Sequence, residues 1–468
     1  EPGSYTNTRT RLVALGNESR QAVSSIFYGI DNVPRKAITM GLGTILKAKR
    51  IILMAWGEEK ATVIKDIVEG EENSATPATC LQKHPNIEVV VDEGASQELT
   101  RVKTPWLVGT CLWPERFIRT AVLWLCRKVD KPILKLTYQD YIDNRLGQLL
   151  EATGQTYDMI NIQVFNDLQH TISGWPGGKP NADDSTRPER ATPYPKRVLI
   201  FSPHPDDDVI SMGGTFIRLI AQGHDVHVAY QTSGNIAVLD DIVLQTLDTA
   251  RECGFVDRYN EVQEIINNKK KGEAEPIELR RRKGSIRRAE AKAACRQMGL
   301  TDPSHVHFLN LPFYETGGVK KGLLTDKDIQ IVVDLLREIK PHQIYAAGDL
   351  SDPHGTHRVC IEAVLAAMEV VQDEEWVKEC RLWLYRGAWQ EWDLDMVDMA
   401  VPLSPDEVIQ KRHAIYRHLS QKDIVPFPGE DKREFWQRAE ERNQNTARLY
   451  DKLGMAEYQA IEVFVRLF

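Results

Sequence analysis

The sequence predicts an α/β protein with two α/β units, the second of which is a Rossmann-like, mostly parallel sheet with helices on both faces. Short apolar runs alternate with helical patterns over most of the 468 residues, and this alternation is typical of strands joined by crossover helices. A hydrophobic content of 42% is also sufficient for the cores of about two to four soluble domains.

The first unit is predicted over residues 1–103. Residues 50–56 form an apolar run that ends before Gly57, which predicts a buried strand, and residues 58–68 have the pattern of the helix that follows. Residues 86–91 predict a second strand. A strand, a helix and a strand in this order favour a parallel sheet.

A helical connector and a linker are predicted between the units. Residues 104–172 are expected to be mostly helical and to join the two units. Residues 173–196 are crowded with proline, glycine and small polar residues and have no helical or strand periodicity, so they predict a linker. The second unit then spans residues 197–468.

The second unit continues the alternation of strands and helices. Its predicted strands span residues 197–202, 225–231, 305–309, 342–347 and 381–386. Its predicted helices span residues 213–222, 325–339 and 356–371, and a charged helical stretch ends at Gly299. Right-handed crossovers make such strands parallel, and ligands then bind beyond the carboxyl ends of the strands.

Candidate metal ligands follow two of these strands. His204 and Asp207 come directly after the first strand of the second unit, in a turn stiffened by two prolines, so that both can face one point. His357 follows the strand at 342–347 and is the third predicted ligand. Three protein ligands leave a fourth tetrahedral position for water, as catalytic zinc requires. The pattern therefore predicts a Zn2+ site, and another divalent metal would suit the same ligands.

Two further side chains complete the predicted chemistry. Asp206 is expected to take a proton as water attacks an amide carbonyl, and protonated His354 is expected to stabilise the oxyanion. Either residue would then protonate the leaving amine. Asp208 and Asp352 are candidates for carboxylates that orient the imidazoles. These roles together predict metal-assisted amide hydrolysis.

Simpler interpretations exist for each motif alone. The His-Pro-Asp-Asp run is also typical of a solvated turn whose aspartate caps the next helix, and His354 and His357 would also suit an exposed helix start. The occurrence of both motifs after strands of one α/β unit favours a site. The remaining histidines of the strand regions are interpreted as ordinary strand or loop residues, namely His224, His227, His305, His307 and His342.

Over residues 195–468 the chain resembles the LmbE-like, or PIG-L, family of zinc-dependent de-N-acetylases. The resemblance rests on the Pro-His-Pro-Asp-Asp run, the later His-x-x-His, and an Arg287-x-x-Glu290 helix between them. It implies N-acetylglucosamine-type substrates and acetate as a product. By this resemblance His204, Asp207 and His357 are the zinc ligands. Asp206 is the base, and His354 is the oxyanion group. Asp208 stands where the family usually has glutamate.

Residues 1–103 resemble the carboxyl-terminal half of glucosamine-6-phosphate deaminase/isomerase. The resemblance lies in five ordered blocks, at residues 1–4, 8–11, 34–44, 57–61 and 81–85. It implies that Lys60 holds the sugar phosphate, that Glu1 assists a catalytic histidine, and that Arg11 lies where some members bind an allosteric sugar phosphate. The family's phosphate loop, catalytic aspartates and histidine have no counterpart here, so we expect no deaminase activity from these 468 residues.

Net charge and cysteine content limit the binding partners and the cellular location that the sequence predicts. The net charge of -8 gives no overall attraction to nucleic acid or to an anionic membrane. The 7 cysteines are odd in number and contain no Cys-x-x-Cys pair, and no signal-peptide pattern is present, so a cytoplasmic location is expected. The expected partner is a small amino-sugar substrate, and a homo-oligomer remains open.

Three functions remain after this reading. The first is a zinc-dependent N-deacetylase in amino-sugar metabolism. The second is a sugar-phosphate-binding module whose zinc site is inactive. The third is a glucosamine-6-phosphate deaminase activity in a longer parent chain.

Overall fold

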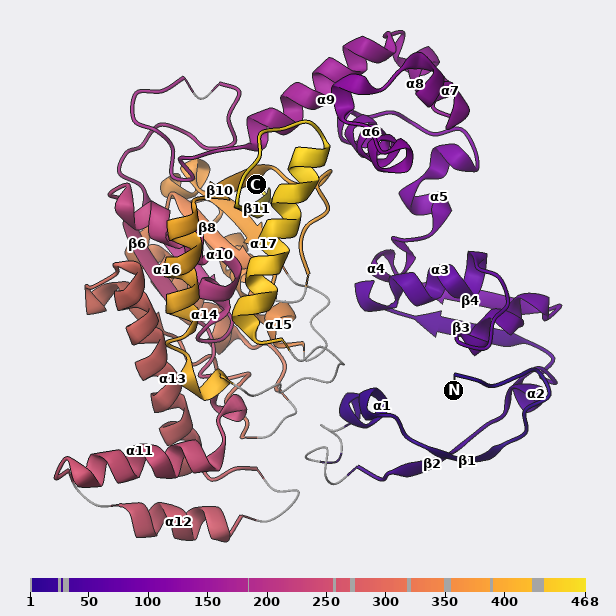
Figure 1. Cartoon of the computed structure of the whole chain (residues 1–468). Coiled ribbons are helices and arrows are strands. Elements are labelled where there is room, and N and C mark those ends of the chain that lie inside the picture. The colour runs from indigo at the N-terminus through magenta and orange to yellow at the C-terminus, as the bar shows by residue number, and fades with distance from the viewer. Residues whose placement is uncertain are drawn as a thin grey trace. The chain divides into compact units, whose positions relative to one another are not determined.

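The computed structural model describes residues 2–23, 27, 33–183, 185–255, 258–269, 274–317, 321–348, 355–387, 390–422 and 433–468. Contacts divide the chain into two compact units (Figure 1). The first unit comprises Glu1–Val129 and Lys135–Asn161, and the second comprises Asp130–Leu134 and Ile162–Phe468. Each unit contains its own sheet structure, as the sequence predicts.

The first unit contains two small sheets. Its strands are β1 (Arg11–Ala14), β2 (Lys36–Thr39), β3 (Ile51–Ala55) and β4 (Ile87–Val91). β1 pairs with β2 antiparallel, whereas β3 and β4 are parallel. Its helices are α1 (Asn17–Ala22), α2 (Leu42–Ile45), α3 (Ala61–Glu69), α4 (Glu93–Ser96), α5 (Thr100–Lys103), α6 (Glu115–Val129), α7 (Tyr138–Asp143) and α8 (Gly147–Thr153). The predicted parallel pair at 50–56 and 86–91 is therefore present.

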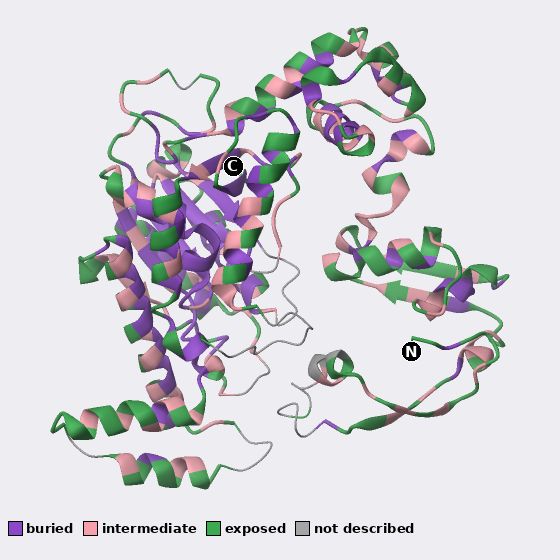
Figure 2. Cartoon of the chain, in the orientation of Figure 1, coloured by how far each residue is buried: buried purple, intermediate pink, exposed green. Residues whose placement is uncertain are grey.

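The β3–β4 sheet of the first unit is covered on one face only. Ile64 of α3 and Ala95 of α4 are buried against it. On the opposite face Ile52, Met54 and Trp56 are 49%, 56% and 57% exposed. In Figure 2 the strands of this unit are accordingly coloured mostly as exposed or intermediate. Alternate residues of a strand face opposite sides, so this face is apolar and open to solvent among the described residues.

The region predicted as connector and linker is divided differently in the structure. The expected helices between 104 and 172 are present, and the last of them, α9 (Tyr157–Thr171), passes from the first unit into the second. Residues 173–196 belong to the second unit. Gln343 donates to the Pro176 carbonyl, and Ser173 donates to Glu189. The first of these buried contacts attaches the proline-rich segment to β8 and the second holds the segment together, and its composition alone did not reveal them.

The second unit is built on a seven-stranded sheet in the order β10-β11-β9-β8-β5-β6-β7. Its strands are β5 (Arg197–Ser202), β6 (Asp225–Tyr230), β7 (Val306–Phe308), β8 (Gln343–Ala347), β9 (Arg381–Tyr385), β10 (Met399–Leu403) and β11 (Ala460–Arg466). The five strands from β7 to β9 are parallel, whereas β11 pairs antiparallel with both β9 and β10. The mostly parallel sheet is confirmed, whereas β10 and β11 were not predicted from the sequence.

Helices cover both faces of this sheet. The helices of this unit are α10 (Asp207–Ala221), α11 (Asp240–Glu252), α12 (Tyr259–Asn267), α13 (Ile277–Met298), α14 (Asp326–Ile339), α15 (Thr356–Val371), α16 (Pro405–Ile415) and α17 (Phe435–Lys452). Of these, α11 and α12 pack with α13 in a small cluster of their own rather than on the sheet. In β5, Val198 and Ile200 pack in the core with α10, α13 and α16, whereas Leu199 and Phe201 pack with α14 and α15. Because both faces are covered, the central strands are nearly continuous apolar runs, as parallel strands usually are.

The strand order reverses between β5 and β8. β5 is followed by β6 on one side, and the chain later returns to place β8 on the other side. In open α/β sheets, ligands bind at such a reversal, beyond the carboxyl ends of the strands. Both predicted metal-binding motifs follow these two strands, so the fold directs them to the same edge.

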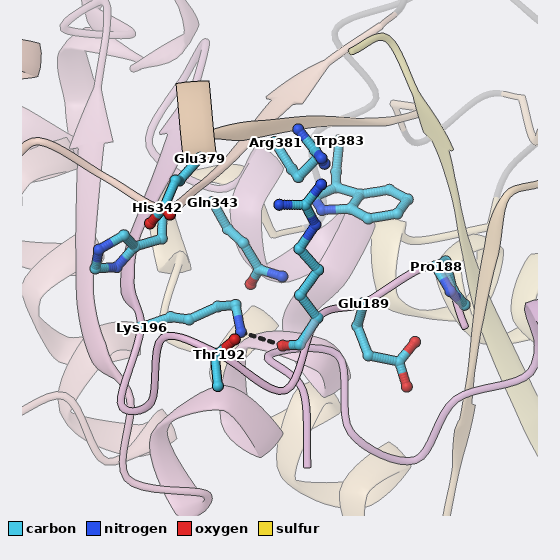
Figure 3. Close-up of a pocket in the computed structure, with 10 residues that line it drawn as sticks. Pro188, Glu189, Thr192, Lys196, His342, Gln343, Glu379, Arg381 and Trp383 are labelled. Carbon is cyan, nitrogen blue, oxygen red and sulfur yellow. Dashed lines mark hydrogen bonds between the residues drawn. The ribbon is translucent and has the colours of Figure 1, made fainter. Parts of the chain in front are cut away.

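A small pocket lies at the opposite end of the same sheet (Figure 3). His342 and Gln343 at the start of β8 and Arg381 at the start of β9 line it, and Lys196 donates to the Arg190 carbonyl beside it. This pocket contains none of the predicted catalytic or metal-binding residues.

No helix in the described parts of the chain is both long enough and apolar enough to cross a membrane.

A candidate metal centre at the carboxyl end of the sheet

The turn after β5 is held in place by backbone and side-chain hydrogen bonds. The N–H and the hydroxyl of Thr232, just beyond β6, both donate to the Pro203 carbonyl, at 3.0 and 2.7 Å. The His204 N–H donates to Asp207 Oδ2 at 2.8 Å. Helix α10 begins at Asp207, six residues before the predicted start. The predicted ligands therefore lie on a fixed turn between a buried strand and a buried helix.

His357 reaches this turn from the other side of the strand-order reversal. It lies in the first turn of α15, which follows Gly355 at φ 70, a left-handed conformation that glycine adopts without strain. Gln231, directly after β6, donates to the Cys360 carbonyl at 2.9 Å and thereby attaches α15 to the end of the sheet. His357 is 8% exposed. Two loops far apart in sequence thus converge at one point.

The three predicted ligand atoms form a nearly equilateral triangle. His204 Nδ1 lies 3.2 Å from Asp207 Oδ2, His357 Nε2 lies 3.2 Å from the same oxygen, and the two nitrogens are 3.2 Å apart. Zinc bonds of about 2.0–2.1 Å in a tetrahedron require ligand atoms about 3.3–3.4 Å apart. The spacing and the chemistry of these donors therefore fit a tetrahedral metal ion with one position left for another ligand.

The charge of Asp207 is consistent with this arrangement. Burial is the largest influence and acts to raise the pKa of Asp207, but His357 and His204 together hold that pKa well below its usual value. Asp207 is 7% exposed. A buried carboxylate that stays ionised beside two imidazoles is a suitable ligand for a divalent cation.

Asp206 points to a different partner. Its Oδ1 lies 3.0 Å from Nη2 of Arg287 in α13, and both side chains are buried. Nε and Nη1 of Arg287 have no hydrogen-bond acceptor among the described residues. The proposed base is thus held by a guanidinium that has N–H groups left over for another acceptor. The sequence reading noted Arg287 only as part of a helix motif and did not predict this ion pair.

Asp208 has a structural role in the turn. It is fully buried, accepts from Ser202 Oγ at 3.2 Å and from the Tyr230 hydroxyl at 3.0 Å, and its own N–H donates to Ser202. Burial raises its pKa to about 7. The suggestion that Asp208 orients an imidazole is therefore wrong: its described partners are two hydroxyl groups.

Other site residues had no signal in the sequence. His418 is 3% exposed, and burial lowers its pKa to about 4, against the influence of Asp206 and Asp207 nearby. The ring of Tyr314 packs edge-on against that of His204, with centroids 5.9 Å apart. Both residues come from irregular segments far along the chain, where no periodicity or motif distinguishes them.

The remaining predicted residues either fall outside the described residues or belong to the first unit. His354, Asp352 and Glu1 fall outside the described residues. Lys60 lies at the junction of β3 and α3, is half exposed, and has its ammonium 3.5 Å from the Glu59 carboxylate. The guanidinium of Arg11 in β1 donates to Ser4 Oγ at 2.9 Å. The proposed sugar-phosphate contacts of Lys60 and Arg11 stay predictions.

Comparison with known proteins gives the class of each part. Residues 199–368 match the family described as PIG-L, GlcNAc-PI de-N-acetylase. This match contains both predicted metal-binding motifs. A solved N,N'-diacetylchitobiose deacetylase from Pyrococcus horikoshii is similar over 58% of this chain and 84% of that one, with 20% identity and a TM-score of 0.37.

The full chain belongs to the family of a glucosamine-6-phosphate deaminase-like protein of Bacteroides thetaiotaomicron. The two are 53% identical over 477 residues, which cover 99% of this chain and 72% of that protein. The first unit is also similar to the glucosamine-6-phosphate deaminase of Bacillus velezensis, with 47% identity over 96 residues that cover 20% of this chain and 40% of the deaminase. The chain thus combines a PIG-L domain with a deaminase-like region that spans about two fifths of that deaminase.

Proposed function

We propose that the second unit is a metal-dependent amidohydrolase that removes an N-acetyl group from an N-acetylglucosamine-type sugar or conjugate, with Zn2+ as the expected metal. The triangle of His204, Asp207 and His357 donor atoms beside Asp206 carries this proposal. The match to the de-N-acetylase family over residues 199–368 supports the choice of an N-acetyl substrate.

The metal would be held by His204, Asp207 and His357. A zinc ion bound there supplies a Lewis acid that polarises the amide carbonyl and acidifies water. The same three ligands would suit another divalent metal of this class.

Asp206 is the proposed general base. Its carboxylate takes a proton from water as the water oxygen bonds to the amide carbon, and it returns that proton to the nitrogen when the C–N bond breaks. The products are acetate and a free amine. Arg287, 3.0 Å from Asp206, holds the carboxylate in position, and its remaining N–H groups are available to a substrate oxygen.

His354 lies outside the described residues and is the proposed oxyanion partner on the basis of the sequence pattern and the family resemblance. The protonated imidazole of His354, next to the reacting carbonyl, would stabilise the negative charge that develops on the oxygen. The same imidazole is the alternative proton donor to the leaving amine.

The test of this function is acetate release together with metal content. Purified full chain is screened against N-acetylglucosamine, its 6-phosphate and N-acetylated disaccharides, and acetate and metal are measured. His357→Ala is expected to lose turnover and tight binding of the ion at this site, whereas Asp206→Asn is expected to keep that ion and lose about 10²–10⁴-fold in rate. The exposed residue His413 offers the matched control His413→Ala. Full activity in His357→Ala would contradict the ligand assignment.

A second candidate concerns the first unit. Its similarity to glucosamine-6-phosphate deaminase favours binding of a sugar phosphate, either as a regulatory module whose partner site is inactive or as part of a deaminase in a longer chain. Calorimetry with glucosamine 6-phosphate tests this candidate. The regulatory candidate requires that the chain binds glucosamine 6-phosphate, that Lys60→Ala weakens this binding, and that no acetate is released. Release of ammonia by this chain would contradict our expectation that it has no deaminase activity.

A further inference from the structure

A second group of metal-binding side chains lies at the other end of the large sheet, where β6 and β7 begin. Asp225 and His227 are two residues apart in β6, and His305 and His307 are two residues apart at the start of β7. Residues two apart in a strand face the same side. Val226, between the first two, is buried in the core on the opposite side.

The pairing of the strands brings these side chains together. β6 and β7 are parallel, with Val228 opposite Val306 and Ala229 opposite His307. One step back along this register places His227 beside His305. The rings of His227 and His305 are stacked, with centroids 4.1 Å apart. A sheet edge that would ordinarily present scattered polar side chains therefore presents adjacent imidazoles.

Asp225 provides a carboxylate to this group. Its Oδ1 lies 3.4 Å from His227 Nε2 and 3.7 Å from His305 Nδ1. All three donor atoms lie within 4.8 Å of one another. The Asp225 side chain is 42% exposed, so a cation has a route to these donors from solvent.

Neighbouring groups orient the two imidazoles. His227 Nδ1 lies 3.1 Å from His307 Nε2. When His227 donates the proton of this hydrogen bond, its other ring nitrogen, Nε2, carries no hydrogen. Nε2 faces Asp225 and is then able to bind a cation. His305 Nε2 faces the Asp302 carboxylate at 3.9 Å. His305 Nδ1 also lies 3.2 Å from the Val226 carbonyl, and a bound cation would take the place of that contact.

We propose that Asp225, His227 and His305 form a second site for a divalent transition-metal cation, separate from the candidate catalytic centre. Two imidazoles and one carboxylate are a typical donor set for Zn2+ and related ions. His307 is a positioning residue that acts through His227. Glu338 of α14 adds negative charge close to both His227 and His307.

An edge strand is also protected from pairing with other chains by polar side chains. That role would be served by charged residues at any spacing. It does not require that donor atoms from β6 and from the residue just before β7 converge, which is the feature that a cation explains.

The test is the metal stoichiometry of the full chain. Metal-stripped protein is dialysed against Zn2+ and analysed for bound metal, and Co2+ is used in parallel because its absorption reports a tetrahedral site. We expect two ions per chain in the wild type and one in the double variant His227→Gln/His305→Gln. His357→Ala is also expected to keep one ion, the one at β6 and β7. His413→Gln is the matched control and should keep two.

A further variant separates loss of a ligand from loss of the fold. Asp225→Asn replaces a partly exposed carboxylate and is expected to weaken only the second ion, by about tenfold or more, with unchanged circular dichroism and acetate release. The proposal is overturned if the wild type binds one ion that His357→Ala removes, or if the Asp225 and His227/His305 variants bind as many ions as the wild type with the same affinity. These outcomes leave the proposed deacetylase unaffected, because its own metal is assayed in the same chains.

Discussion

Replacing Lys411 by methionine should destabilise the second unit strongly, because it leaves a buried carboxylate without its counter-charge. Glu462 of β11 is fully buried, and its Oε1 lies 2.7 Å from Lys411 Nζ. It also accepts from the backbone N–H groups of Gly214 and Thr215, at 3.0 and 2.7 Å.

These contacts satisfy the backbone at an interruption in the helix that begins at the candidate metal centre. Met212 has non-helical φ and ψ of -138 and 24 inside α10. Downstream of it, N–H groups of the helix donate to Glu462, and upstream the carbonyls of Ile210 and Ser211 accept from Arg442, each at 3.3 Å. The kink is therefore stabilised by one charged side chain on each side.

The magnitude follows from the burial of both charges. Removing one partner of a buried ion pair costs about 3–5 kcal/mol, because the other charge is left uncompensated. Lys411→Met should reduce the free energy of unfolding by that amount. In Lys411→Met/Glu462→Gln the remaining amide is neutral and still accepts hydrogen bonds, so we expect a loss of about 1–2 kcal/mol. The double variant should thus be more stable than the single variant.

Urea denaturation followed by tryptophan fluorescence measures these changes. Lys452→Met, at an exposed position near the end of α17, is the matched control and should change stability by less than about 0.5 kcal/mol. A cost of less than about 1 kcal/mol for Lys411→Met would refute this reasoning. It would also be refuted if the loss of stability in the double variant equalled the sum of the losses in Lys411→Met and Glu462→Gln.

Three other predictions concern pH, the metal centre and the first unit. Burial lowers the pKa of His224 from 6.5 to about 4. Neutral His224 therefore makes its full contribution to the free energy of unfolding above pH 6.5, and this contribution is lost as the pH falls toward 4. Between pH 6.5 and 4 the free energy of unfolding should therefore fall by about 1–2 kcal/mol less in His224→Gln than in the wild type. The control variant His413→Gln should show the same fall as the wild type. Asp207→Asn should remove the ion held by His204, Asp207 and His357, with little change in circular dichroism, and unchanged metal content would contradict its role. Gly41→Ala would bring a Cβ to 2.2 Å from the Arg9 carbonyl carbon, so it should lower the melting temperature of the first unit while acetate release is unchanged; an unaltered melting curve would disagree.

Local patterns in the sequence were sufficient to locate most strands of the large sheet. The apolar run at 197–202 coincides with β5, and the strands predicted at 342–347 and 381–386 differ from β8 and β9 by one residue at most at each end. Strands buried on both faces are recognisable because nearly every residue in them is apolar. β10 and β11 were missed, although β11 pairs antiparallel with β9, which the pattern did predict.

The candidate metal centre was partly visible for a similar reason. His204 and Asp207 are three residues apart, and the positions of both motifs after strands of one parallel sheet implied that His357 would join them. The ion pair between Asp206 and Arg287 joins residues 81 positions apart, since 287 less 206 is 81. Its formation depends on how α13 packs against the turn.

The sequence by itself determined the class of fold, the edge of the sheet that carries the chemistry, and the donor types at that edge, because these follow from local periodicity and from the direction of parallel strands. Only the tertiary structure decided that His418 and Arg287 join the same site, that Asp208 binds hydroxyl groups, and that His227 and His305 stack beside Asp225. Such neighbours are set by the packing of helices and by strand register, which bring together residues whose separation along the chain carries no periodic signal.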